Sequence, residues 1–310
     1  MTQMHLINGK QVSRLAFGTM QFGGTADASE SRALYDLCRA TGITHFDTAV
    51  RYTDGASERL LGPMVSAERE DVFVATKVGY SGGAGRANIM EQWGWSRDQL
   101  RLDTVDLLYM HRFDPDTDLE ETFSTLAELQ QSGAVRYIGV SNYAAWQVMK
   151  AQAVAAALGT RIDAIQPMYN LVKRQAEVEI IPMACDQDIA IIPYSPLGGG
   201  LLTGKYAAGG AGRIRDNKMY AARYAQDWMH DAAAALSRIA KDENVDPATL
   251  AVAWIMHQPG DIMPILSARS VAQLKPSLAA ANFEMSHELL ARITALSPTP
   301  PPATDRLEEA

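Results

Sequence analysis

The sequence has few cysteines and no long apolar run, and each shortage excludes a class of protein. Only Cys38 and Cys185 occur among the 310 residues, and they lie far apart in the chain. Two distant cysteines do not make a disulfide framework or a cysteine-rich metal site, so we expect free thiols and no metal. No window approaches the roughly 18 consecutive apolar residues of a membrane-spanning helix, and the opening MTQMHLINGKQ lacks the apolar core of a signal peptide. We therefore expect a cytoplasmic protein without a membrane span.

Basic tracts are also missing. The chain carries 28 Lys and Arg residues against 36 Asp and Glu, which gives a net charge of −8. Proteins that bind nucleic acid concentrate positive charge on one surface, so this balance argues against a nucleic-acid partner. An anionic ligand would need a local positive site.

Short apolar runs recur along the chain, and each is followed by a polar or glycine-rich turn. We predict strands at residues 15–19, 43–48, 71–77, 105–111, 135–142, 162–168, 189–195 and 261–267. Their near-continuous hydrophobicity is typical of parallel strands that are buried on both faces. Helical patterns occupy residues 29–42, 57–65, 88–101, 119–133 and 144–159, and two more precede the last strand. Gly42, Gly133 and Gly159 stand where a helix C-terminal cap is expected.

This alternation of strands and helices predicts the fold. Eight parallel strands with helices between them favour a closed (β/α)8 barrel of the α/β class, with residues 1–310 as one domain. The alternative is an open doubly wound sheet. The segment GTMQFGGTA (18–26) argues against it, because it lacks the G-x-G-x-x-G spacing of a dinucleotide-binding turn.

Three segments fall outside the repeat. Residues 5–13, HLINGKQVS, predict a small N-terminal β-hairpin around Asn8-Gly9. Residues 195–218 form a long glycine-rich loop after the seventh strand, at the end of a barrel where loops build sites and act as lids. The tail at residues 297–310 is polar and rich in proline, and we expect it to be flexible.

Polar residues stand at the ends of the predicted strands, at intervals of about 30 residues. Asp47 ends the second strand, Lys77 the third and His111 the fourth. Tyr52 follows in the loop after Asp47. Because the carboxyl ends of barrel strands meet on one face, we expect these four side chains to converge.

Such a group of four suits proton transfer to a carbonyl. A free phenol has a pKa of about 10, and a nearby ammonium group lowers it by stabilising the phenolate. Asp47 would hold the charged Lys77 in place beside the phenol. A neutral His111 would orient a carbonyl oxygen, and Tyr52 would protonate it. Hydride would have to come from a cofactor, since no side chain supplies it.

Each of the four residues also has a structural explanation when it is taken alone. Asp47 can cap the loop that follows it, Tyr52 can be a packing residue, and His111 can be a satisfied polar group. Lys77 is harder to explain in this way, because a lysine at the end of an apolar strand needs a partner. The joint placement at one face favours the catalytic interpretation.

Five ordered motifs resemble those of the aldo-keto reductase family. They are FDTAVRYTDGASERLLG, VFVATKVG, DLLYMHRFDPDTDLEET, AVRYIGVSNY and PYSPLGGGLLTGKY, and they extend over nearly the whole chain. The resemblance implies a (β/α)8 barrel and NAD(P)H-dependent reduction of aldehydes, ketones or sugars. It also implies that Asp47, Tyr52, Lys77 and His111 are the family's catalytic tetrad, without substitution, and that Tyr52 is the general acid.

The resemblance further implies a set of cofactor contacts. The side chains expected around the nicotinamide are Ser141, Asn142, Gln166 and, as the stacking partner of the ring, Tyr194. The residues expected along the pyrophosphate, on the loop after the seventh strand, are Ser195, Leu197, Gly199 and Lys205. The residues expected near the adenosine are Ser267, Arg269 and Gln273.

The adenosine end departs from the family pattern. The family commonly has a Gly where Ser267 stands, and Glu-Asn near the start of the next helix, where this chain has Pro276 and Ser277. Arg269 and Lys275 either meet a 2′-phosphate or are solvated surface charges. On this basis we expect NADP(H), with NAD(H) as the alternative.

A small carbonyl compound or alcohol is the expected partner. Phe22, Arg51 and Trp93 lie beside the catalytic positions or on adjoining loops, and we expect them to line the substrate pocket. Arg51 either favours a polar or anionic substrate or pairs with an acid such as Asp54.

Two other functions stay open. Some relatives are dehydrogenases that oxidise a sugar or pyridoxal-type alcohol, and the altered adenosine end is compatible with such an enzyme. Others are nucleotide-sensing partner subunits, as in the potassium-channel β subunits of the family. No feature of the sequence specifies an oligomeric state.

Overall fold

The protein was analysed as a computed structural model that describes residues 4–207, 209–306 and 308. Its centre is a parallel sheet of eight strands in the order β7-β6-β5-β4-β3-β2-β1-β8. The strands are β1 (Ala16–Gly18), β2 (His45–Asp47), β3 (Phe73–Val78), β4 (Val105–Met110), β5 (Val135–Ser141), β6 (Ala164–Gln166), β7 (Ala190–Ile191) and β8 (Ile265–Leu266).

The two ends of this strand order meet. In β7, the backbone N–H of Ile191 donates to the carbonyl of Asp261 at 3.1 Å, and its carbonyl accepts from the N–H of Met263 at 2.8 Å. Two residues further along both segments, the Ile265 N–H donates to the Pro193 carbonyl at 2.9 Å. The sheet therefore closes on itself, which confirms the predicted (β/α)8 barrel and excludes the open sheet.

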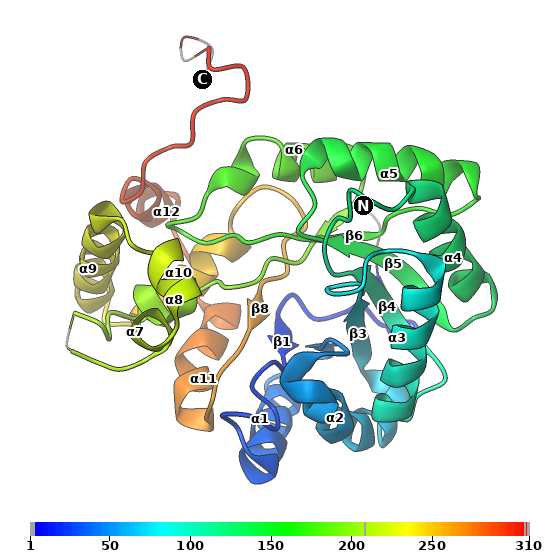
Figure 1. Cartoon of the computed structure of the whole chain (residues 1–310). Helices are drawn as coiled ribbons and strands as arrows, with labels where there is room; N and C mark the ends of the chain where they lie inside the picture. The colour runs from blue at the N-terminus through cyan, green and yellow to red at the C-terminus, as the bar shows by residue number, and fades with distance from the viewer. Residues whose placement is uncertain (1–3, 208, 307, 309–310) are drawn as a thin grey trace.

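Helices surround the sheet (Figure 1). Those between strands are α1 (Ala28–Ala40), α2 (Ala56–Ser66), α3 (Arg86–Leu100), α4 (Leu119–Gln131), α5 (Ala145–Ala157), α6 (Ile180–Asp186), α9 (Asp227–Asp242) and α10 (Pro247–Met256). After β8 come α11 (Val271–Leu278) and α12 (His287–Thr294). Gly42, Gly133 and Gly159 follow α1, α4 and α5 with φ of 85°, 77° and 73°, the left-handed conformation expected just past a helix.

The predicted elements agree with the structure except in a few places. The strands are shorter than predicted, because only their central residues pair. Helices α6 and α12 were not predicted as elements. They have 7 and 8 residues, and so short a helix gives a weak periodic signal.

Strand side chains alternate between the barrel interior and the layer under the helices. In β3, Phe73 and Ala75 belong to the inner hydrophobic cluster, whereas Val74 and Val78 pack in the outer one. This alternation follows from the period of two in a strand. It places Lys77, the next inner position, inside the barrel near its carboxyl end.

The N-terminal segment covers the opposite end of the barrel. Met4 and Leu6 are buried in the inner cluster, and a single antiparallel bridge joins His5 to Gln11. No pair of extended strands is assigned within residues 4–13. The predicted two-stranded hairpin is therefore not confirmed, and a tight turn with one bridge takes its place.

The long loop after β7 contains short helices. They are the 3₁₀ helix η4 (Gly198–Thr203), α7 (Arg213–Asp216) and α8 (Lys218–Arg223). Figure 1 shows α7 and α8 in yellow-green on the side of the barrel that also holds α9 and α10. Residue 208 of this loop lies outside the described residues.

The C-terminal segment runs away from the barrel after α12 (Figure 1). The flexibility of residues 297–310 stays a prediction, and residues 307, 309 and 310 lie outside the described part of the chain. The one-domain organisation of residues 1–310 also stays a prediction. In the described residues, no helix is both long and apolar enough to cross a membrane.

Candidate active site

A buried ion pair lies at the carboxyl end of the barrel. The ammonium nitrogen of Lys77 is 2.5 Å from Oδ1 of Asp47 and donates to the Thr48 carbonyl at 2.7 Å. The other oxygen of Asp47 accepts from Nε2 of Gln166 at 2.9 Å. The side chains of Lys77 and Asp47 are 0% and 3% exposed. Strands β2, β3 and β6 therefore deliver one buried charge pair to the barrel interior.

Tyr52 and His111 lie above this pair. The Lys77 ammonium is 5.1 Å from the centre of the Tyr52 ring, and the rings of Tyr52 and His111 are 6.0 Å apart in an edge-to-face arrangement. Tyr52 opens the 3₁₀ turn η1 (Tyr52–Gly55), in which Thr53 and Asp54 take left-handed φ of 50° and 52°. The structure thus brings together all four residues that the sequence assigned to proton transfer.

The pKa of Tyr52 moves in the direction opposite to the expected one. Burial raises the pKa of the phenol above its usual 10.0, and the Lys77 charge opposes this rise only in part. Lys77 behaves differently: burial by itself would lower its pKa, but the Asp47 carboxylate and the Tyr52 phenol raise it instead. At neutral pH the site therefore holds a charged ammonium group beside a protonated phenol.

His111 is neutral at physiological pH. Burial first, and then the charges of Lys77 and Arg112, lower its pKa from 6.5 to about 3. A neutral imidazole carries one N–H donor, which suits a hydrogen bond to a carbonyl oxygen. The Tyr80 ring also contacts the imidazole edge-to-face, at 5.0 Å between ring centres.

Amide and hydroxyl groups line the neighbouring strand ends. Asn142, with a left-handed φ of 58°, donates from Nδ2 to the Ser141 hydroxyl at 3.0 Å and to the His111 carbonyl at 3.0 Å. Its Oδ1 accepts from the Tyr194 hydroxyl at 2.8 Å, and Ser141 donates to the Gln166 carbonyl at 3.0 Å. The four residues predicted around the nicotinamide therefore form one contiguous group, which fits a carboxamide and a flat ring.

The start of the long loop forms a tight backbone cradle. Gly198, Gly199 and Gly200 take φ of 55°, 66° and 93° in succession, and a Cβ at Gly199 would lie 2.8 Å from the Tyr220 ring. Three left-handed residues in a row with no side chains let a ligand approach the backbone closely. The N–H groups of Gly198 and Gly200 donate to the carbonyls of Ser195 and Leu197, and no backbone acceptor among the described residues is assigned to the Gly199 N–H. Of the other predicted residues here, Ser195 also has a left-handed φ of 61°, and Leu197 is partly buried and accepts from the Gly200 N–H at 2.9 Å.

Cations gather behind this cradle. Burial, followed by the charges of Arg269 and Arg213, lowers the pKa of Lys205. The Asp216 carboxylate opposes this fall in part. Three cations and one acid leave a net positive group, which fits the phosphates of a nucleotide. The sequence interpretation included Lys205 and Arg269 but missed Arg213, because its position depends on how the long loop folds.

The β8–α11 junction holds the remaining predicted residues. Ser267 is exposed just after β8, and the Gln273 side chain accepts from the Arg269 N–H at 3.2 Å. Pro276 lies inside α11, and its carbonyl accepts from the Thr249 hydroxyl at 2.7 Å. Ser277 is buried. The two residues that replace the family's Glu-Asn therefore face α10 and the core.

The predicted substrate-pocket residues divide into two groups. Phe22 and Trp93 are 0% and 3% exposed and pack in the outer hydrophobic cluster, and their place in a substrate pocket stays a prediction. The buried positions of α3 include Ile89, Trp93 and Leu100, which share one helical face. That spacing was visible in the sequence and would have identified Trp93 as a core residue.

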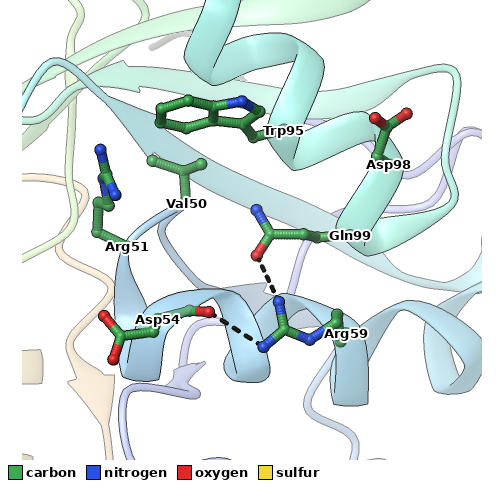
Figure 2. A pocket seen from close by; sticks show the side chains of 7 residues that line it. All are labelled: Val50, Arg51, Asp54, Arg59, Trp95, Asp98 and Gln99. Carbon is green, nitrogen blue, oxygen red and sulfur yellow. Dashed lines mark hydrogen bonds between the residues drawn. The ribbon is translucent and has the colours of Figure 1, made fainter.

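Arg51 does line a pocket, together with Trp95 (Figure 2). Its guanidinium carbon lies 4.7 Å from the centre of the Trp95 ring. No ion pair between Arg51 and Asp54 is present, so the expected alternative of a local salt bridge is wrong. Trp95 was missed because two residues of helix turn it by about 200° from Trp93.

The fold and the grouped rim residues define a (β/α)8 enzyme-like site, and comparison with known proteins defines the family. The model of the Aldo/keto reductase family matches residues 14–298, and the chain belongs to this family. Aldo-keto reductases generally use NAD(P)H, and membership supports an oxidoreductase role.

Several curated proteins are similar over most of their length. Aldo-keto reductase YhdN of Bacillus subtilis is 34% identical, over 86% of this chain and 84% of that protein. Aldo-keto reductase str7 of Strobilurus tenacellus is 29% identical, over 92% and 89% respectively. A probable voltage-gated potassium channel subunit beta of Oryza sativa is 31% identical, over 96% and 97%.

Proposed function

We propose that the protein reduces an aldehyde or ketone to an alcohol with NAD(P)H, and that Tyr52 is the general acid. The observation that carries this proposal is the buried Lys77–Asp47 pair directly beneath the Tyr52 phenol. Such a charged pair is costly to bury, and a purely structural role would not require a phenol and a neutral imidazole above it. When bound, the cofactor supplies the hydride.

The protein's residues then account for the proton. Tyr52 remains protonated at neutral pH because burial raises its pKa, so its hydroxyl is ready to donate. The Lys77 ammonium stabilises the phenolate left after donation, and Asp47 holds that ammonium in place. Neutral His111 donates a hydrogen bond that positions the carbonyl oxygen.

The same pKa direction bears on the alternative dehydrogenase function. Oxidation of an alcohol needs a phenolate at position 52 that accepts a proton. Since burial raises the pKa of Tyr52, the protonated form dominates at neutral pH, and reduction is the favoured direction. We expect oxidation to increase towards alkaline pH.

The proposal is tested by Tyr52→Phe, with Tyr80→Phe as the matched control. Tyr80 also contacts His111 but is 53% exposed. Tyr52→Phe should lower kcat for an aldehyde by about 10²–10⁴-fold, the usual contribution of a general acid, while quenching of protein fluorescence by NADPH is retained. Tyr80→Phe should change kcat little. Unchanged turnover in Tyr52→Phe would refute the mechanism.

We propose NADP(H) as the preferred cofactor. The grouping of Lys205, Arg213 and Arg269 supports it, because a 2′-phosphate adds a charge that bidentate guanidinium groups bind well. Arg269→Met should weaken NADPH binding by about tenfold and leave NADH binding nearly unchanged. Equal losses for both cofactors would contradict this preference. A cytoplasmic location stays a prediction from the sequence.

A second candidate is a nucleotide-sensing partner subunit. Similarity to the probable potassium channel subunit beta of Oryza sativa, at 31% identity, supports it. A panel of aldehydes, ketones, sugars and pyridoxal, measured at 340 nm with both cofactors, separates the candidates. NADPH binding without turnover of any of them would favour the partner subunit.

A further inference from the structure

A cavity of about 300 Å³ lies between helix α3 and the segment that runs from Val50 to the start of α2. Figure 2 shows Arg51 and Trp95 at one end of it, and Asp98, Gln99 and Arg59 at the other. Arg51 is the residue immediately before Tyr52. One residue of the cavity lining and the proposed general acid are therefore neighbours in the same turn.

The guanidinium of Arg51 is stacked but has no charged partner. It lies 4.7 Å from the centre of the Trp95 ring, and no described residue forms a hydrogen bond or an ion pair with its side chain. Contact with the ring face holds the guanidinium in place, and its N–H groups stay available. A planar fork held in this way is suited to bind a carboxylate with two hydrogen bonds.

The opposite wall limits the charge of the ligand. Arg59 is held by the Gln99 side chain at 3.3 Å and by the Asp54 carbonyl at 3.0 Å. The cavity is thus lined by two guanidinium groups and by the carboxylates of Asp54 and Asp98, and these four formal charges cancel. A dianionic phosphate would meet more repulsion here than a carboxylate with one charge.

We infer that Arg51 and Trp95 form a carboxylate subsite, and that the substrate class is a carbonyl compound that carries a carboxylate. This inference rests on the proposed function. The carbonyl would lie at Tyr52 and His111, and the carboxylate would bind Arg51 with two hydrogen bonds. The face of Trp95 would cover the carbon atoms between the two groups.

The test compares 4-carboxybenzaldehyde with its methyl ester, which lacks the charge and carries one additional methyl group. In the wild-type protein, kcat/KM for the acid should exceed that for the ester. Arg51→Met should lower this acid-to-ester ratio by about 10- to 100-fold, the range for a charge-assisted bidentate pair. Arg51→Lys should restore it only in part, because an ammonium group has no fork. Arg238→Met, which removes an exposed charge on α9, should leave the ratio unchanged.

The ester separates failure of this inference from failure of the proposed function. Turnover of both compounds with a ratio that Arg51→Met does not change would overturn the carboxylate subsite while the reductase function stands. If neither compound is turned over, the proposed function fails, and binding decides the subsite. Benzoate titrated calorimetrically into the NADP-loaded protein should then bind at least about tenfold more weakly to Arg51→Met than to wild type. Equal binding would overturn the inference.

Discussion

Each end of the barrel holds a buried carboxylate that is paired with one or more basic side chains. The two ends differ in whether the basic side chains contact only the scaffold or also face a residue of the candidate site. At the amino end, Asp106 accepts from Arg136 at 2.5 Å, from Arg69 at 2.7 Å and from the Val74 N–H at 2.7 Å. Arg136 also donates to the His5 carbonyl at 2.9 Å, which ties down the N-terminal segment. All these contacts join elements of the scaffold to one another.

At the carboxyl end, the scaffold does not occupy every side of the lysine. Lys77 contacts Asp47 and the Thr48 carbonyl, and its remaining side faces the Tyr52 ring. The comparison shows that burial of an ion pair does not by itself mark a site. What distinguishes the carboxyl end is a charge that faces a titratable group at the open rim.

Removal of Lys77 should have the largest effect. Lys77→Met leaves Asp47 buried without a cation, which should destabilise folding by about 3–5 kcal/mol, and it removes the charge that stabilises the phenolate. We expect kcat to fall by about 10³-fold or more. Urea unfolding and steady-state kinetics measure the two effects.

A double variant separates them. Asp47→Leu with Lys77→Met removes both charges, so most of the lost stability should return, because apolar pairs replace buried ion pairs well. Activity should stay lost. Recovery of activity along with stability would show that the pair acts only through the scaffold, as its counterpart at the amino end does.

The pair at the amino end should behave in the opposite way. Asp106→Asn should destabilise the protein by about 2–3 kcal/mol, less than Lys77→Met because the side chains of Arg69 and Arg136 are 18% and 28% exposed. The kcat of the folded protein should stay within about twofold of wild type, because residues that are far apart and share no partners usually act independently. A large loss of kcat without unfolding would break the comparison between the two ends.

His45 is the first residue of β2, and it should give the smallest effect near neutral pH, as a pH dependence. It is 0% exposed, its ring nitrogens have no hydrogen-bond partner among the described residues, and burial, followed by Lys77, lowers its pKa from 6.5 to about 3. As pH falls below 6.5, the unfolded chain binds a proton that the folded chain excludes. Stability should therefore fall by up to about 1.4 kcal/mol per pH unit towards pH 3.

His45→Phe should flatten this part of the stability curve, because it removes the titrating group and keeps a ring next to Phe73, 4.8 Å away. Thermal unfolding at pH 7 and pH 5 measures it. His111 contributes a loss in the same direction, so some slope should remain in the variant. An unchanged slope would mean that His45 is not the buried neutral base described here.

The sequence allowed much of the fold and part of the site to be predicted. The strand pattern and the residues at strand ends were sufficient to group Asp47, Lys77 and His111, because parallel strands in a barrel share one direction. Prediction was weaker where position depends on a loop. Arg213 approaches Lys205 only through the folding of a loop that contains α7 and α8. No periodic pattern in the sequence predicts such a contact.

Some features that the prediction left out were visible locally and others were not. The spacing of α3 also gives Trp93, which was expected at the substrate pocket, a place in the core. The pKa of Tyr52 was expected to fall because Lys77 is near, but desolvation has the larger effect. Desolvation depends on every group packed around the ring, and no short stretch of sequence predicts that packing.

The sequence by itself determined the barrel, its direction and the residue types at the rim, because hydrophobic period and strand order follow from local chemistry. Only the tertiary structure decided which charges are paired. It gave Asp106 a full set of partners, left Lys77 one side facing a phenol, and left Arg51 stacked on Trp95 without an acid. Pairing depends on distances of a few ångströms between residues far apart in the chain, and those distances exist only once the barrel has closed.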